Sequence, residues 1–200
     1  NLVYKAVKLF LEKNNITNQK IFVNIEKNIP VCAGLAGGST DGAGVLLGLN
    51  ELFSKPCSDN NLHKLCAELG SDLNVCLKGG KIFAKGRGEI IEPIKFEEFA
   101  VNLIKPKNLG ISAKEAYSKF SYKLKNNIEL DLRQNFVNDL EWAVVDDYDE
   151  LLYIKRNYPL SVMTGSGTTY YSLDERFLPH QNYWVKNGLK AISTGCELVV

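Results

Sequence analysis

Apolar residues recur three or four positions apart in several stretches of the chain, which is the spacing of one buried helix face. In the first stretch Leu2, Ala6 and Phe10 follow this spacing, and Ser58 and Gly70 bracket another as start and stop signals. We therefore predict four helices with buried faces. They cover residues 2–14, 41–53, 58–70 and 137–154.

Other segments alternate apolar and polar residues or carry short β-branched runs, as strands do. Residues 20–30 alternate and end at Pro30, residues 71–89 predict two short strands around Gly79 and Gly80, and residues 100–106 predict another strand. Residues 160–173 predict a strand, a small-residue turn and a strand. Strands interleaved with helices indicate an α+β protein with two lobes, which we divide between residues 99 and 100.

Composition excludes several classes of function. The 200 residues carry a net charge of +1, so nothing in the overall charge favours nucleic acid or an anionic membrane, and no apolar run reaches the roughly 20 residues of a membrane span. Five cysteines form no CxxC pair and only His63 and His180 could add imidazole ligands, which disfavours a metal site or a disulfide framework. We interpret both histidines as surface residues and both tryptophans as packing residues.

Residues 30–40, PVCAGLAGGST, lie between a predicted strand and a predicted helix. Glycines there leave backbone N–H groups free to bind phosphate, and the positive end of a helix dipole adds to the attraction. Ser39 and Thr40 could either cap the helix or contact phosphate. The alternative is a tight turn that serves close packing. No Gly-Lys-Ser/Thr sequence occurs, and Ala36 breaks a GxGxxG match, so neither a P-loop nor a dinucleotide fingerprint is present.

Asp72 is the best candidate for an acid–base group. It follows the predicted helix stop at Gly70 and precedes a predicted apolar strand, a position from which a side chain can reach a cleft. Local sequence equally allows a capping or turn aspartate. Asp41, the other acid near the glycine-rich segment, is expected to serve the N-terminus of the following helix.

The segment IPVCAGLAGGSTDGAG resembles the second motif of the GHMP kinases, and the resemblance continues through LGSDLNVC, NDLEWAV and VMTGSGTT in the family order. The longer form GLAGGSTD is similar to the motif of the family branch that phosphorylates 4-diphosphocytidyl-2-C-methyl-D-erythritol. The resemblance implies a two-lobed fold, with a ribosomal-protein-S5-like lobe at 1–99 and a ferredoxin-like lobe at 100–200. It also implies ATP with Mg²⁺, a small-molecule substrate, and neither nucleic acid nor membrane as partner.

The resemblance assigns roles residue by residue. Asp72 corresponds to the catalytic aspartate, the TGSG turn at 164–167 supports the nucleotide segment, and NDLE at 138–141 is interpreted as structural. Gly38 stands where other members keep a metal-binding Ser, so no metal ligand is assigned. The resemblance further implies that the nucleotide-binding residues are Pro30, Val31, Cys32, Ala33, Gly34, Leu35, Ala36, Gly37, Gly38, Ser39 and Thr40.

Several departures from the family pattern leave alternatives open. Ala36 replaces a usual Gly, where an αR or β backbone would accommodate the methyl group, Asn74 replaces a usual Pro, and Cys76 a usual aromatic. Residues 174–188, interrupted by Pro179, are shorter than the helix that the family has there.

The family's PAKINL-like and GYHEL-like segments do not occur, so we expect an N-terminally incomplete chain that is weakly stable or inactive alone, and a full gene product that is the kinase. The alternatives are a homoserine or mevalonate type of kinase and a non-catalytic nucleotide-binding relative. The expected compartment is a bacterial cytoplasm or a plastid stroma.

Overall fold

The computed structural model describes residues 1–199, and these form two compact units. Unit 1 comprises Asn1–Asn28, Ala36–Glu98 and the chain from Ile192 onward, and unit 2 comprises Ile29–Leu35 and Phe99–Ala191. One division, between residues 98 and 99, lies next to the predicted lobe boundary. The glycine-rich segment, however, passes from unit 2 to unit 1 between Leu35 and Ala36.

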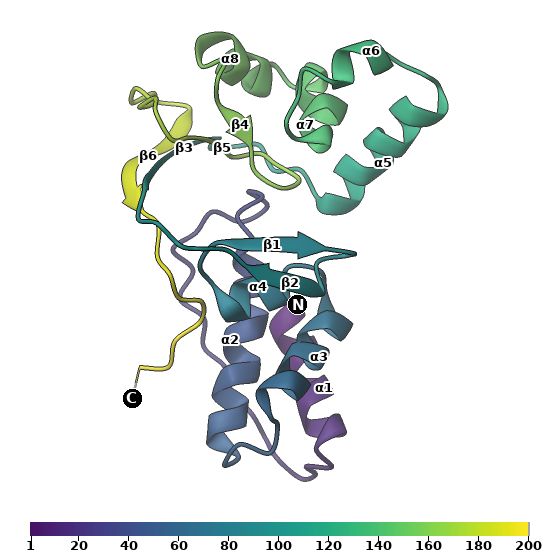
Figure 1. The fold of residues 1–200 in the computed structure, drawn as a ribbon, viewed down its shortest axis with the longest axis vertical. Coiled ribbons are helices and arrows are strands. Elements are labelled where there is room, and N and C mark those ends of the chain that lie inside the picture. The colour runs from purple at the N-terminus through teal and green to yellow at the C-terminus, as the bar shows by residue number, and fades with distance from the viewer. Residues whose placement is uncertain (200) are drawn as a thin grey trace. The chain divides into compact units, whose positions relative to one another are not determined.

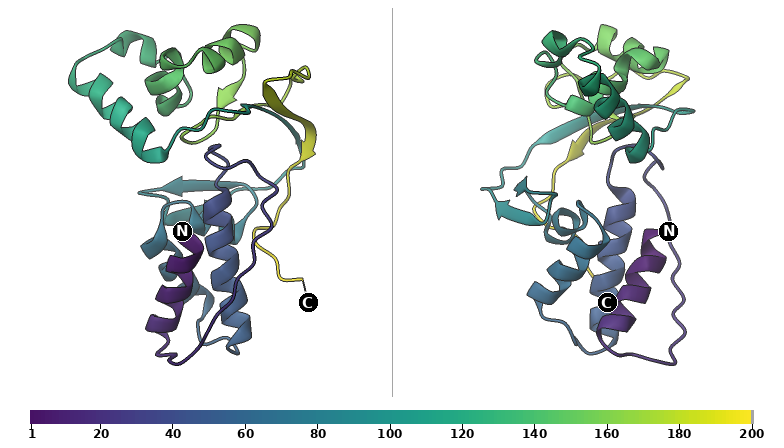
Figure 2. Two further views of the ribbon diagram at one scale, coloured as in Figure 1. Left: turned by 180° about the vertical axis from the view of Figure 1, so that it is seen from behind. Right: turned by 90° about the vertical axis from the view of Figure 1, so that its right-hand side faces the viewer.

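Unit 1 is built from four helices and a hairpin (Figure 1). Helix α1 runs beside α2, and α3 and α4 complete the layer (Figure 2). The helices are α1 (Leu2–Lys13), α2 (Gly37–Leu52), α3 (Asp59–Leu69) and α4 (Leu73–Lys78), and the antiparallel hairpin is β1 (Ile82–Lys85) with β2 (Ile90–Pro93). Their apolar faces meet in a core that contains Ala6, Phe10, Leu46, Leu49, Leu62, Leu65, Cys66 and Leu73.

The helices predicted at 2–14 and 58–70 are confirmed, and side chains cap both. Asn1 accepts a hydrogen bond from the Val3 N–H, and Ser58 accepts one from the Asn61 N–H. The helix predicted at 41–53 begins earlier, at Gly37. The predicted start is too late because Gly37 to Thr40 carry no apolar side chains, and a helical period is recognised only from apolar side chains.

Two predicted strands in unit 1 are wrong. Residues 20–30 form no strand, and Phe22 is 92% exposed, because no other strand of the described residues pairs with this segment. The first half of 71–89 is helix α4, since Leu73 and Leu77, one turn apart, both face the helical core. Within this segment only β1 is β structure, and its partner β2 begins just after the segment, at Ile90.

Unit 2 is an antiparallel sheet with strand order β4-β5-β3-β6, packed against helices (Figures 1 and 2). The strands are β3 (Ala100–Pro106), β4 (Val162–Met163), β5 (Tyr170–Ser172) and β6 (Tyr183–Lys190). The helices are α5 (Ala113–Lys125), α6 (Leu130–Arg133), α7 (Asp139–Val144), the 3₁₀ turn η1 (Val145–Asp147) and α8 (Asp149–Asn157). The core lies between them and includes Ile104, Trp142, Leu151, Ile154, Met163 and Tyr170.

The strand predicted at 100–106 and the hairpin predicted at 160–173 are confirmed. The single helix predicted at 137–154 is wrong, because the chain breaks into α7, η1 and α8. The break falls at Tyr148, whose backbone is extended and whose hydroxyl donates to Glu115 on α5. Part of the segment 174–188 forms the strand β6, and the segment contains no helix. No helix in the described residues is long and apolar enough to cross a membrane.

Candidate nucleotide-binding and catalytic site

The first half of the glycine-rich segment, residues 30–35, is held by the hairpin turn of unit 2. The Thr164 hydroxyl donates to the Gly34 carbonyl at 2.9 Å, and the Thr169 N–H donates to the Ala33 carbonyl at 3.1 Å. Ala33 is buried, whereas Cys32 is exposed. The TGSG turn therefore lies beside the glycine-rich segment, as the family resemblance implies.

Gly34 is required by both conformation and space. Its φ of +70° lies in the left-handed region, and a Cβ atom there would lie 2.2 Å from the Thr164 carbonyl oxygen. Any side chain would push the segment away from the turn. The glycine at this position is therefore explained by contact with the turn, independently of any ligand.

The second half of the segment is the start of α2. Ala36 is the N-cap residue and makes no side-chain cap, and the N–H groups of Gly37, Gly38 and Ser39 donate to no acceptor among the described residues. Apart from its chain neighbours and the backbone of α2 itself, no atom lies within 4 Å of the position that a Cβ of Gly38 would occupy. Uncapped N–H groups at the positive end of a 16-residue helix favour an anion.

Ala36 corrects one expectation. Its φ of 51° and ψ of 18° are left-handed, and not the αR or β conformation that we expected. The segment must reverse direction here to start α2, and a left-handed residue makes that reversal. A usual Gly at this position is thus explained by backbone geometry, and Ala36 carries the strain of roughly 1–2 kcal/mol that glycine avoids.

Asp72 lies beside the first turns of α2. Leu73, the next residue, packs on Gly42 of α2, where a Cβ atom would meet the Leu73 side chain at 3.2 Å, and α4 as a whole contacts α2. Asp72 is the N-cap residue of α4, but its side chain is exposed and does not cap. Its carboxylate makes no hydrogen bond or ion pair with any residue from 1 to 199. The prediction of a preceding helix stop was correct, while the element that follows is a helix and not a strand.

Asp41 differs from its expected role. It lies beyond the first turn of α2 and forms an ion pair with Lys27. Ser39 and Thr40 also do not cap α2, because they lie inside it, and the Thr40 hydroxyl donates to the Ala36 carbonyl at 3.2 Å. Across the described residues, no group of three or more His, Cys, Asp or Glu side chains could hold a metal ion.

Sequence reasoning missed several polar contacts near the site. The His63 ring nitrogen Nδ1 lies 2.9 Å from Oδ1 of the buried Asn74, so His63 is not the solvated surface residue that we expected. Lys105, 3% exposed, donates to the carbonyls of Pro106 and Leu109, and its burial lowers its pKa. Only the position of Lys105 inside an apolar strand signals this burial in the sequence.

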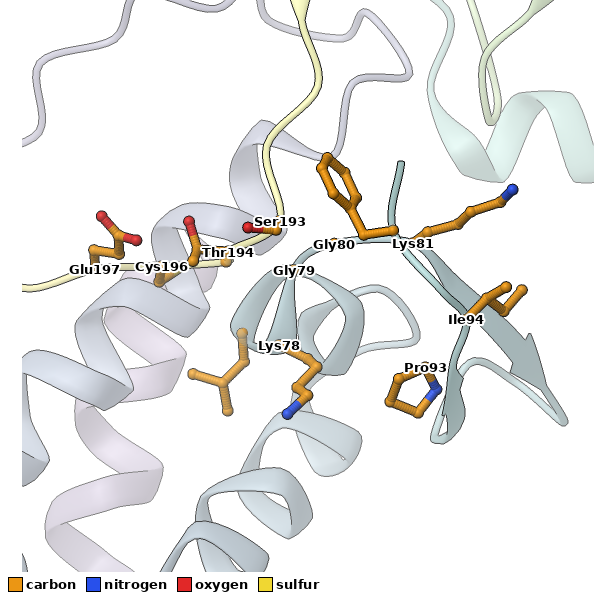
Figure 3. A pocket seen from close by; sticks show the side chains of 13 residues that line it. Lys78, Gly79, Gly80, Lys81, Pro93, Ile94, Ser193, Thr194, Cys196 and Glu197 are labelled. Carbon is orange, nitrogen blue, oxygen red and sulfur yellow. The ribbon is translucent and has the colours of Figure 1, made fainter. Parts of the chain in front are cut away.

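The chain from Ser193 to Glu197 crosses α4 and contacts the start of α2. The Cys196 N–H donates to the Cys76 carbonyl at 3.2 Å, and its thiol lies 3.5 Å from the Thr40 carbonyl oxygen. Burial raises the pKa of both thiols. A pocket of about 420 Å³ opens beside this crossing, at the C-terminal end of α4 (Figure 3), and no predicted site residue lines it.

Comparison with known proteins supports the family resemblance. Residues 1–80 match the family described as GHMP kinases N terminal domain. The 4-diphosphocytidyl-2-C-methyl-D-erythritol kinase of Prochlorococcus marinus (strain NATL1A) is 38% identical over 172 residues, which are 81% of this chain and 53% of that protein. The enzyme of the same name from Clostridium botulinum (strain Hall) is 37% identical over 201 residues, covering 90% of this chain and 71% of that protein.

The chain belongs to the 4-diphosphocytidyl-2-C-methyl-D-erythritol kinase family. The crystal structure of a 4-(cytidine 5'-diphospho)-2C-methyl-D-erythritol kinase is similar with a TM-score of 0.67 and 28% identity, over 88% of this chain and 69% of that one. The GHMP kinase fold that we predicted is thereby confirmed. The chain spans about half the length of the Prochlorococcus relative, 53%.

Proposed function

We propose that this protein phosphorylates a hydroxyl group of 4-diphosphocytidyl-2-C-methyl-D-erythritol with ATP, in the non-mevalonate route to isoprenoid precursors. The shared family supports the substrate, since the relatives carry the name of this kinase. The observation that carries the chemistry is the unpartnered Asp72 carboxylate beside the uncapped N-terminus of α2. A carboxylate with no protein partner is free to accept a proton from a substrate.

The nucleotide would bind along residues 30–40. The free N–H groups of Gly37, Gly38 and Ser39 would donate to phosphate oxygens, and the dipole of α2 would add attraction. Mg²⁺ would come with ATP and neutralise charge on the phosphates, which is compatible with a site that offers few side-chain ligands because phosphates and water supply most of them.

Asp72 would act on the acceptor. Its carboxylate takes the proton of the substrate hydroxyl as the oxygen of that hydroxyl bonds to the γ-phosphorus, and the bond from this phosphorus to ADP breaks. Phosphoryl transfer depends mainly on positioning and charge, so the base adds to a rate that the bound geometry already raises. We further propose that residues 1–99 form the nucleotide-binding lobe and residues 100–200 the second lobe, in a bacterial cytoplasm or, alternatively, a plastid stroma.

The test is Asp72→Asn. We expect turnover to fall about 10²- to 10⁴-fold, because the amide cannot accept the proton, while ATP affinity changes less than about twofold. Steady-state kinetics and calorimetric titration with a non-hydrolysable ATP analogue measure the two effects. Asp59→Asn is the matched control, since Asp59 is also an exposed acid at the start of a helix of unit 1. Unchanged turnover in Asp72→Asn would remove Asp72 from the reaction.

A second candidate is a nucleotide-binding relative without kinase activity. The left-handed Ala36 favours it, because its methyl group lies on the backbone that would face the phosphates. ATP binding without transfer to any alcohol would support this candidate. A substrate panel that includes homoserine and mevalonate distinguishes the remaining GHMP specificities.

A further inference from the structure

The side chain of Asn138 holds the TGSG turn and caps a helix at the same time. Its Oδ1 accepts from the Leu140 N–H at 2.9 Å, which caps α7. Its Nδ2 donates to the carbonyls of Met163 and Gly165, both at 2.8 Å. The amide therefore uses its acceptor and both donors, a combination that Asp, Ser and Thr lack.

Glu141, one turn further along the chain, binds the other backbone group of Met163 in strand β4, its N–H. Its side chain is fully buried, and Oε2 accepts from the Met163 N–H at 3.0 Å. Its Oε1 lies 3.1 Å from Nζ of Lys155 on α8. The Met163 backbone is thus fixed at its carbonyl by Asn138 and at its N–H by Glu141, immediately before the turn.

The TGSG turn also fixes the first half of the glycine-rich segment. Thr164 and Thr169 donate to the carbonyls of Gly34 and Ala33, and Gly34 lies too close to the turn for any Cβ atom. All these residues belong to unit 2, so the chain of contacts from Asn138 to Gly34 lies within one compact unit. Two hydrogen bonds and a contact this close leave the segment little freedom to move relative to the turn.

We propose that Asn138 is a positioning residue for nucleotide binding: through Met163 and Gly165 it sets the place of the turn, and through the turn the place of Ala33 and Gly34. These residues lead directly into Ala36 and the N-terminus of α2. The effect on ATP rests on the proposed function, whereas the effect on the position of Gly34 does not. The segment NDLE, interpreted from its sequence as structural, thereby acquires a role in positioning the glycine-rich segment.

The experiment is Asn138→Asp in the intact protein. Aspartate keeps the acceptor for the Leu140 N–H but places an oxygen opposite the two carbonyl oxygens, so the cap survives and the anchor fails. We expect the amide resonances of Gly34 and Gly165 to shift in the ligand-free protein. We also expect KM for ATP to rise about tenfold or more with a smaller change in kcat, because misplaced binding groups weaken binding.

Two further variants make the result specific. Thr164→Val removes the donor to Gly34 without touching Asn138 and should reproduce the Gly34 shift and the rise in KM, even if Asn138→Asp folds poorly. Ser112→Ala is the control, because Ser112 caps α5 in the same unit and forms no hydrogen bond with residues 164–169. It should leave both resonances and KM unchanged.

Unmoved Gly34 resonances in both Asn138→Asp and Thr164→Val would overturn the proposal. Shifted resonances with unchanged KM would overturn its nucleotide part. If the two variants shift the Gly34 resonance but the wild-type protein itself binds no ATP, the positioning role is supported and the proposed function is contradicted.

Discussion

Helices α4 and α7 are both six residues long and both follow a polar N-cap residue, yet these two residues are employed in opposite ways. Asn138 uses its acceptor and both donors on backbone groups of unit 2. Asp72 leaves its carboxylate exposed and unbonded within the described residues, although capping α4 would satisfy it. The helix start is the same motif in both regions, and only the surroundings decide whether its side chain supports the fold or remains available for chemistry.

The acids of the two regions show the same contrast. Glu141 is completely buried, accepts a hydrogen bond from the Met163 N–H and forms an ion pair with Lys155. Burial and, after it, the nearby Glu141 carboxylate raise the pKa of the Tyr170 hydroxyl. A buried acid of this kind is costly to remove, because its partners lose their compensation. An exposed acid such as Asp72 contributes little to the fold and can be replaced without structural loss.

The largest effects are expected when turnover and the free energy of unfolding are both measured on variants of Asp72 and of Glu141. Asp72→Asn should lower turnover about 10²- to 10⁴-fold and change the free energy of unfolding by less than about 0.5 kcal/mol. Glu141→Leu should destabilise unit 2 by about 3–5 kcal/mol, because the Met163 N–H and Lys155 lose a buried partner. Urea denaturation and steady-state kinetics on both variants give the comparison.

Glu141→Gln sharpens this test. Glutamine keeps an acceptor for the Met163 N–H and loses only the charge opposite Lys155, so it should destabilise less than Glu141→Leu. A stable Glu141→Leu protein, or a strongly destabilised Asp72→Asn protein, would contradict the division between a structural and an available acid.

The rate of thiol alkylation should distinguish the exposed Cys32 from the buried Cys66. Cys32, in the first half of the glycine-rich segment, is exposed, whereas burial raises the pKa of Cys66 to about 12. At pH 8 iodoacetamide should modify Cys32 at least about tenfold faster than Cys66, because the thiolate is the reactive form. Mass spectrometry of peptides at timed intervals measures both rates.

ATP extends the cysteine experiment to the proposed binding site. Saturating ATP with Mg²⁺ should slow the modification of Cys32 and leave Cys66 unaffected. Equal rates for the two cysteines would contradict the described exposure, and a Cys32 rate insensitive to ATP would count against nucleotide binding along residues 30–40.

The smallest expected effect concerns Ala36. Ala36→Gly removes left-handed strain of roughly 1–2 kcal/mol but adds conformational freedom to the unfolded chain, which offsets roughly 0.5–1 kcal/mol. We expect a stabilisation of about 0–1 kcal/mol in thermal unfolding, with ATP affinity equal or higher. A destabilisation above about 1 kcal/mol would show that the methyl group makes contacts that outweigh the strain.

The sequence alone determined the elements whose signals are local. The cap at Ser58, the helix at 2–14, the strand at 100–106 and the hairpin at 160–173 follow from spacing and end signals within each segment. The family motifs likewise indicated the glycine-rich segment and Asp72 as the candidate site. Which of these residues bind nucleotide or act in catalysis stays a prediction.

Tertiary structure decided what depends on distant partners. Residues 20–30 alternate like a strand but find no strand to pair with, and the segment after Asp72 is helical because Leu73 packs on Gly42. The left-handed Ala36 and the double anchoring by Asn138 are equally invisible in the sequence. The physical reason is common to all four: hydrogen-bond partners and buried neighbours come from residues far along the chain, and local periodicity contains no information about them.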